Sequence, residues 1–121
     1  MLFLRYLFTT ALLSLTWVAP VVAADESSEW SEKFAPFVYR QDDPSLLILA
    51  GEIDIRTSLN FSRFVLEHGV PEVLFLDSPG GIVHVALDIA LKVDALAIDT
   101  VIPEEFGCYS ACAFIFLAGS E

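Results

Sequence analysis

The fold is decided by residues 73–81, Val-Leu-Phe-Leu-Asp-Ser-Pro-Gly-Gly, where an unbroken apolar run leads directly into a glycine turn. An apolar run of this length before a turn is typical of a strand buried on both faces. A second informative stretch, residues 107–118, places a single serine, Ser110, between an apolar strand and a very apolar segment. The two stretches predict strands that end in turns, each followed by a helix.

The same alternation of strand and helix extends from residue 46 to residue 118. Strands are expected over 46–50, 73–76 and 98–102, and helices over 57–68, 82–96 and 111–118. The middle helix has the clearest period, because its apolar residues recur at positions i, i+3, i+4, i+7 and i+8. The alternation predicts an α/β fold with a parallel sheet that helices cover on both faces.

Residues 1–23 have the order of a secretory signal peptide. One basic residue, Arg5, precedes an apolar run that extends to Val18, and small residues lead to an expected cleavage site after Ala23. Cleavage after Ala24 and retention as an uncleaved membrane anchor are the alternatives. We expect an exported bacterial protein, periplasmic or secreted, that meets the membrane only through this segment if it is not cleaved.

The rest of the chain divides into an acidic leader or linker, residues 24–44, and one α/β domain, residues 45–121. Within the leader, Phe37 to Tyr39 is a candidate edge strand. All 17 acidic residues follow the signal segment, whereas one of the six basic residues, Arg5, lies inside it. This charge repels nucleic acid and anionic lipid, so neither is expected as a partner.

Ser110 is the candidate nucleophile. Hydrolases place a nucleophilic serine at a strand-to-helix turn and form an oxyanion hole from backbone N–H groups. At the start of a helix, the helix dipole favours a developing negative charge. Gly81 has no Cβ, so a substrate carbonyl can approach its backbone closely. The alternative is that Ser110 only caps the helix.

Three segments carry a resemblance to a known superfamily. These are the turn at residues 51–53 (Gly-Glu-Ile), the turn at residues 78–81 (Ser-Pro-Gly-Gly) and residues 107–119, which end in Ala-Gly. In this order they resemble the Clp-protease and crotonase superfamily, and most closely its exported branch of serine-peptidase-like bacterial proteins. The resemblance covers residues 46–119.

The resemblance implies a repeated β-α fold and a serine peptidase or related hydrolase. It implies Ser110 as the nucleophile, the N–H groups of Gly81 and Ala111 as the oxyanion hole, and a peptide or protein as the substrate. In the Clp proteolytic subunit the catalytic His and Asp follow the serine at distances that would place both beyond Glu121.

No general base is expected in this chain. His68 and His84 are expected on helix surfaces, and Lys33 and Lys92 match no serine–lysine dyad. A serine hydroxyl without a base is a poor nucleophile at neutral pH, so we expect little activity unless a longer form supplies the His. The alternatives are a non-catalytic binding or assembly module of the same fold, which self-associates through its apolar last helix, and a truncated gene product.

Cys108 and Cys112 lie two residues to either side of Ser110. Export into an oxidising compartment favours a disulfide between them, which would bridge the serine turn. Two buried thiols and a nucleophilic cysteine are the alternatives. Because no His or further Cys lies nearby, the pair is not expected to bind a metal, and no cofactor is expected.

Overall fold

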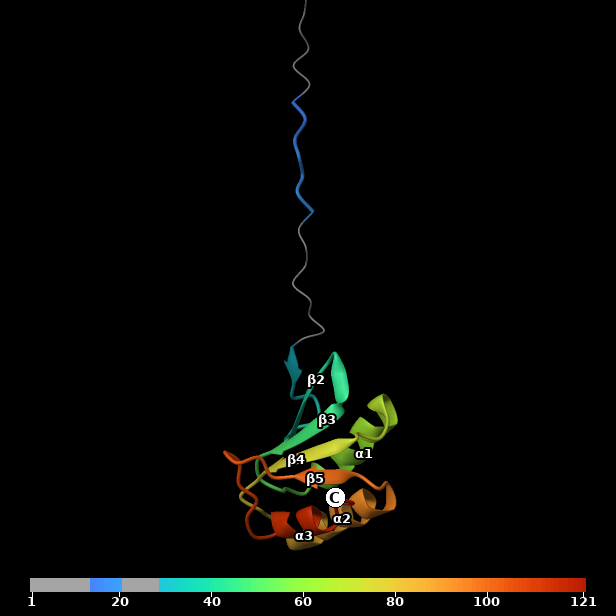
Figure 1. The fold of residues 1–121 in the computed structure, drawn as a ribbon, viewed down its shortest axis with the longest axis vertical. Coiled ribbons are helices and arrows are strands. Elements are labelled where there is room, and N and C mark those ends of the chain that lie inside the picture. Colours follow the sequence, from blue (N-terminus) through green and yellow to red (C-terminus); the bar gives the residue numbers. More distant parts are fainter. Residues whose placement is uncertain (1–13, 21–28) are drawn as a thin grey trace, which may run out of the picture.

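The structure is a computed structural model that describes residues 14–20 and 29–121 (Figure 1). The expected cleavage sites after Ala23 and Ala24, most of the signal segment and the acidic start of the leader lie outside the described residues. Residues 14–20 have no regular secondary structure and are exposed. Among the described residues, no helix has the length and apolar character that spanning a bilayer requires.

Five strands form one mixed sheet in the order β1-β2-β3-β4-β5. They are β1 (Trp30–Ser31), β2 (Phe37–Arg40), β3 (Asp43–Ala50), β4 (Val73–Asp77) and β5 (Asp99–Val101). β1, β2 and β3 pair antiparallel, whereas β3, β4 and β5 pair parallel. The three predicted strands are therefore confirmed as the parallel part of an α/β fold, and the amino-terminal residues add an antiparallel part.

Three helices connect or follow the parallel strands: α1 (Thr57–His68), α2 (Val83–Ala95) and α3 (Cys112–Leu117). α1 ends where predicted, because Gly69 has a φ of 87° and its N–H donates to the carbonyl of Val65 at 2.8 Å. α3 begins after the predicted residue, because Ser110 and Ala111 form a turn before it.

The helices cover one face of the sheet rather than two. The side chains on one face of β3 and β4, namely Leu47, Leu49, Leu74 and Leu76, are fully buried in one core with side chains of all three helices. Leu46, Ile48 and Phe75, on the opposite face, are partly exposed. Because β3, β4 and β5 follow one another in chain order, two right-handed crossovers place α1 and α2 on the same side. The expectation of cover on both faces was therefore wrong for the described residues.

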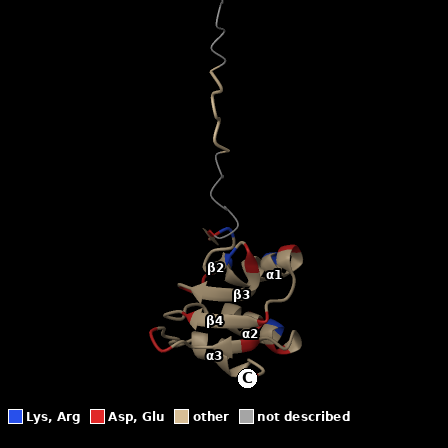
Figure 2. Cartoon of the chain, turned by 45° about the horizontal axis from the view of Figure 1, so that its top comes forward, with Lys and Arg blue, Asp and Glu red and all other residues tan. Residues whose placement is uncertain are grey.

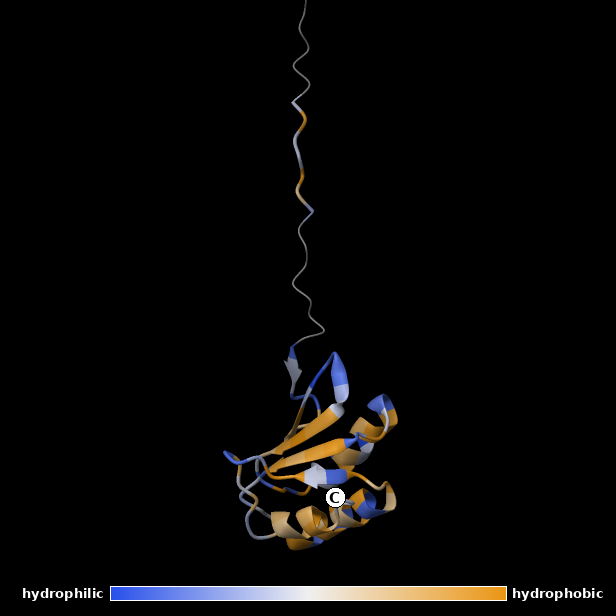
Figure 3. Cartoon of the chain, in the orientation of Figure 1, coloured by the Kyte–Doolittle hydropathy of each residue, from blue (hydrophilic) through white to orange (hydrophobic). Residues whose placement is uncertain are grey.

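Residues 30–40, which sequence patterns placed in the leader, belong to the sheet. Phe34, Phe37 and Tyr39 are buried in the same core as Phe61 and Phe64 of α1. The predicted strand at Phe37 is present as β2, although β1 lies outside it, so β2 is an inner strand. Figure 3 shows the hydrophobic residues gathered in the central strands and the helices.

Candidate functional site

The loops after β3 and β4 meet at the carboxyl ends of the parallel strands (Figure 1). The N–H of Gly51 donates to the carbonyl of Asp77 at 3.0 Å, and the N–H of Ile53 donates to the carbonyl of Gly80 at 2.8 Å. The N–H of Ile82 donates in return to the carbonyl of Ile53 at 2.9 Å. These bonds fix the glycine turn on the preceding loop.

The loop after β5 is bonded to the other side of the same turn. The N–H of Ser78 donates to the carbonyl of Gly107 at 2.7 Å, and the N–H of Tyr109 donates to the carbonyl of Ser78 at 3.0 Å. The N–H of Gly107 donates to Oδ1 of Asp77 at 3.2 Å. Asp77 therefore holds this loop through its side chain. Loops from three neighbouring strands converge on the glycine turn.

Ser110 has an unusual backbone for a residue with a Cβ. Its φ is 52°, in the left-handed region, which costs a non-glycine residue roughly 1–2 kcal/mol. Its side chain is exposed and makes no hydrogen bond to any described residue. The N-cap of α3 is Ala111 and no side chain caps it. Ser110 therefore does not have the capping role that was the alternative to a nucleophile.

The two glycines of the turn are required by close contacts with the neighbouring loops. A Cβ on Gly80, where φ is 98°, would lie 2.7 Å from the carbonyl oxygen of Tyr109 and 2.8 Å from Cβ of Ser110. A Cβ on Gly81, where φ is 146°, would collide with the carbonyl of Ile53. Gly81 therefore lacks a side chain because Ile53 packs against it, a reason that the sequence did not reveal.

The predicted oxyanion hole consists of N–H groups that have no acceptor. Within the described residues, neither the N–H of Gly81 nor that of Ala111 donates a hydrogen bond. Gly81 is exposed, so water can satisfy its N–H. Ala111 is only 1% exposed, and buried N–H groups are almost always paired in folded proteins. The Ala111 N–H is therefore an unusual buried donor without a described acceptor.

Cys108 and Cys112 form a disulfide across the Ser110 turn, which confirms the expected pairing and excludes the two alternatives of free thiols. Their Cα atoms are 5.2 Å apart. Cys112 is fully buried, while Cys108 is half-buried. Closing a loop this short contributes about 2 kcal/mol in the chain-entropy description, which is comparable to the cost of the left-handed serine.

Neither histidine is bonded to Ser110. The Nε2 of His68 lies 3.1 Å from the hydroxyl of Tyr39, and its ring packs against Phe34 and Phe64. His68 is therefore half-buried in an aromatic cluster, and the expectation of a surface position was wrong. His84 is exposed near the start of α2, as expected, and makes no hydrogen bond to a described residue.

Lys92 belongs to a polar cluster that sequence patterns did not predict. Its Nζ lies 2.7 Å from Oγ of Ser58, 2.9 Å from Oγ of Ser62 and 3.0 Å from a carboxylate oxygen of Asp88. The Ser58 hydroxyl donates to Asp88, and this bond, followed by the one from Lys92, lowers the pKa of Asp88 below its usual value. The Ser58–Lys92 contact therefore joins α1 to α2, and the Lys92 ammonium is paired with Asp88.

The spacing of four between Asp88 and Lys92 signals an ion pair on a helix, but Ser58 lies 30 residues before Asp88. Only the packing of α1 on α2 brings the serine to the pair. Sequence alone therefore indicates half of this cluster.

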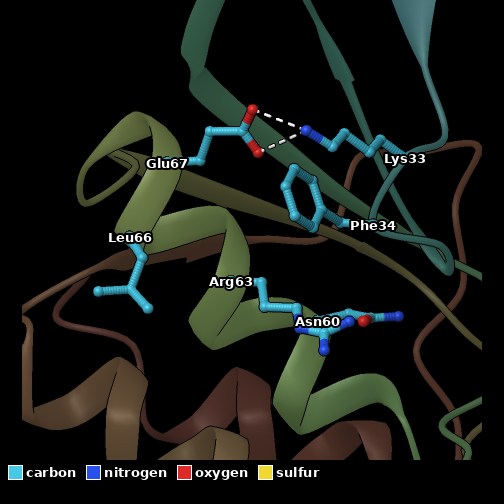
Figure 4. Close-up of a pocket in the computed structure, with 6 residues that line it drawn as sticks. All are labelled: Lys33, Phe34, Asn60, Arg63, Leu66 and Glu67. Carbon is cyan, nitrogen blue, oxygen red and sulfur yellow. Dashed lines mark hydrogen bonds and ion pairs between the residues drawn. The ribbon is translucent and has the colours of Figure 1, made fainter.

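One surface hollow lies away from the glycine turn. It has a volume of about 420 Å³ and is lined by Lys33, Phe34, Asn60, Arg63, Leu66 and Glu67 (Figure 4). Lys33 pairs with Glu67 at 2.7 Å, and this hydrogen bond raises the pKa of Lys33 and lowers that of Glu67. None of the lining residues belongs to the three converging loops.

The converging loops are acidic. Glu52 follows β3, and Glu104 and Glu105 follow β5, all of them exposed (Figure 2). These carboxylates disfavour an anionic substrate near Ser110. Among the described residues, no group of three His, Cys, Asp or Glu side chains is placed to bind a metal ion.

Comparison with known proteins finds no family model, no curated protein and no solved structure that matches this chain.

Proposed function

We propose that this chain supplies the nucleophile and the oxyanion hole of an exported serine hydrolase that acts on peptides or proteins. Ser110 attacks the substrate carbonyl, and the N–H groups of Gly81 and Ala111 bind the oxygen that becomes negative. The observation that supports this most directly is the unpaired N–H of the buried Ala111, next to an exposed serine in the left-handed conformation. The resemblance to the Clp-protease and crotonase superfamily agrees with these roles.

In the proposed reaction, Oγ of Ser110 forms a bond to the carbonyl carbon and gives up its proton. The carbonyl electron pair moves to oxygen, which the two N–H groups stabilise, and then returns as the amine leaves with a proton. Each proton transfer needs a base or acid, and no described side chain is bonded to Ser110 for this purpose. The resemblance implies that a His in a longer form has this role, so turnover by the present chain is expected to be slow.

The test is covalent labelling with a small alkyl fluorophosphonate, followed by intact mass and peptide mapping. The proposal predicts a single adduct on Ser110, formed slowly, and its loss in Ser110→Ala with an unchanged circular dichroism spectrum. Ser58→Ala is the matched control, because Ser58 is the serine in contact with a lysine. An adduct that maps to Ser58, or one that survives Ser110→Ala, would refute the assignment.

Binding of a phenylboronic acid tests the oxyanion hole without turnover. The boronate oxygen should shift the amide resonances of Gly81 and Ala111 in a ¹⁵N spectrum, because it occupies the position of the oxyanion. Ser110→Ala should abolish both shifts. Boronate binding that moves other amides and leaves these two unchanged would place the site elsewhere.

A second candidate function, a non-catalytic assembly module, rests on the exposed apolar residues of α2 and α3. Val83, Leu87 and Leu91 recur at a spacing of four and form a stripe along α2. Phe114 and Leu117 of the neighbouring helix are exposed as well. This candidate predicts self-association in sedimentation velocity that Leu87→Glu weakens. A monomer at all concentrations, with no labelled serine, would exclude both candidates.

A further inference from the structure

The Ser110 turn is held by two kinds of restraint. Gly80 packs against Ser110, and Ser78 bonds to Tyr109 in the next loop; both restraints persist as long as the domain is folded. The Cys108–Cys112 disulfide is the third restraint, and it differs from the others because a reductant can remove it by thiol–disulfide exchange.

We propose that the Cys108–Cys112 disulfide is a redox control of the Ser110 site. With the bridge closed, Ser110 stays left-handed and the Ala111 N–H stays unpaired. After reduction, Ser110 turns to the right-handed conformation and α3 extends by residues at its amino end. The Ala111 N–H then lies in the first turn of the extended helix, changes its direction relative to Oγ of Ser110, and no longer faces the same carbonyl oxygen. The effect on reactivity rests on the proposed function, whereas the conformational change does not.

The backbone geometry indicates why the helix stops short in the oxidised form. The N–H of Cys112 donates to the carbonyl of Tyr109, and that of Ala113 to the carbonyl of Ser110, at 3.1 and 3.0 Å. Both bonds join residues three positions apart, as in the 3₁₀ turn that often precedes an α-helix. Ser110, between the two cysteines, is the residue whose positive φ interrupts the helical dihedrals. The bridge spans this interruption.

The two cysteines differ in burial, and this difference determines which sulfur a reductant attacks in thiol–disulfide exchange. Cys108 is half-buried and Cys112 is fully buried, so a reductant reaches Sγ of Cys108 first. A thiolate of an external dithiol attacks this sulfur and forms a mixed disulfide, and Cys112 leaves with the electron pair and takes a proton. The second thiol of the reductant then releases Cys108, so that the dithiol is oxidised and both cysteines become thiols.

The left-handed conformation costs Ser110 roughly 1–2 kcal/mol, which favours the right-handed turn once the bridge is open. Loss of the bridge is therefore expected to shift the population of the left-handed turn by a factor of roughly 5–30. A shift of this size changes the rate of labelling at Ser110 by the same factor if the left-handed turn is the reactive one.

The experiment compares the oxidised protein with the protein reduced by dithiothreitol, using ¹⁵N spectra and fluorophosphonate labelling in parallel. The expected result is a shift of the Ser110 and Ala111 amide resonances on reduction, and a labelling rate that falls roughly 5–30-fold. Circular dichroism should show that the reduced domain is still folded. The double variant Cys108→Ser, Cys112→Ser should behave like the reduced protein with or without dithiothreitol.

Ser110→Gly is the matched conformational control. Glycine adopts a positive φ without a steric cost, so in this variant the turn should stay left-handed after reduction, and the Ala111 amide should shift much less. If reduction shifts Ala111 equally in the variant and in the wild-type protein, the serine conformation is not what the bridge controls.

The remaining outcomes separate the inference from the proposed function. Amide shifts on reduction without labelling in either state would support the conformational control and refute the nucleophile. Equal labelling and unchanged amides in both states would refute the control and leave the nucleophile in place. Unfolding of the domain on reduction would also overturn the inference, because the bridge would then stabilise the whole fold.

Discussion

Within residues 14–20 and 29–121, two turns hold a non-glycine residue with positive φ, and the cause of this conformation differs between them. Ala97 has a φ of 53° and Ser110 a φ of 52°, so the backbone cost is nearly the same. Ala97 follows the carboxyl end of α2, whereas Ser110 precedes the amino end of α3. Left-handed residues are common just after the carboxyl end of a helix, where they help to end it, but they have no such role before the amino end.

The bonds around Ala97 account for its conformation. The N–H of Ala97 donates to the carbonyl of Asp94, and the N–H of Ile98 donates to the carbonyl of Val93, both at 3.1 Å. This is the Schellman pattern that satisfies the last carbonyls of a helix, and the buried pair Val93 and Ile98 supplies its hydrophobic contact. Helix termination thus offsets the strain at Ala97, while the strain at Ser110 gains no such bonds. Backbone strain without a local structural reason is more often found at functional sites.

The largest expected effect comes from Gly80→Ala. The new Cβ would overlap with Tyr109 and Ser110, so the variant should lose about 3 kcal/mol in the free energy of unfolding by urea. Gly69→Ala is the matched control, because Gly69 also has a positive φ but a Cβ there meets no atom within 4 Å. It should lose about 1–3 kcal/mol from its backbone conformation alone, and less than Gly80→Ala. Equal losses would mean that Gly80 does not support the Ser110 turn.

A smaller effect is expected when each left-handed residue becomes glycine. Ala97→Gly and Ser110→Gly should each raise the free energy of unfolding by about 0.5–1 kcal/mol, because relief of the steric cost exceeds the extra entropy of the unfolded chain. Only Ser110→Gly should abolish fluorophosphonate labelling. If Ser110→Gly lowers the free energy of unfolding while Ala97→Gly raises it, the serine side chain contributes to the fold. The two left-handed residues would then not be comparable.

The smallest effect concerns Asp88 of α2, the helix that precedes Ala97. Its folded pKa is lowered by Ser58 and Lys92, so its contribution to stability is full above the unfolded pKa and is lost as pH falls through the folded pKa. Asp88→Asn should therefore lower the free energy of unfolding by less than about 1 kcal/mol at pH 7 and by much less near pH 2. Labelling at Ser110 should not change. If Asp88→Asn lowers the free energy of unfolding by the same amount at both pH values, the loss comes from packing and not from the charge of Asp88.

The helices and parallel strands were predictable because their signals are local. A period of 3.6 marks α2, and Gly69 marks the end of α1. Residues 30–40 carried a weaker signal: Phe37 and Tyr39 alternate as in a strand, but the run is short and Phe34 lies outside this period. Their place in the core depends on α1, which lies later in the chain.

Of the candidate site, sequence indicated the residues and the disulfide but not the geometry. A motif identifies Ser110 as a turn residue. Its positive φ, however, depends on packing against Gly80 and on the bond between Gly107 and Asp77, which lie 30 residues apart in the sequence. The unpaired N–H of Ala111 depends likewise on where α3 begins. The contact of Ser58 with Lys92 joins two helices and could not be read from either one.

The order of the strands also has a consequence for how this domain acquires its structure. Each strand pairs only with strands next to it in the sequence, and paired residues of the parallel strands are just 26 or 27 positions apart. A chain of this kind closes only short loops as it folds, which favours rapid folding. Each strand after β1 also finds its partner already formed when the chain emerges amino end first from the ribosome. The sheet can therefore grow by one strand at a time in the direction of synthesis, with the Ser110 turn assembling after these five strands.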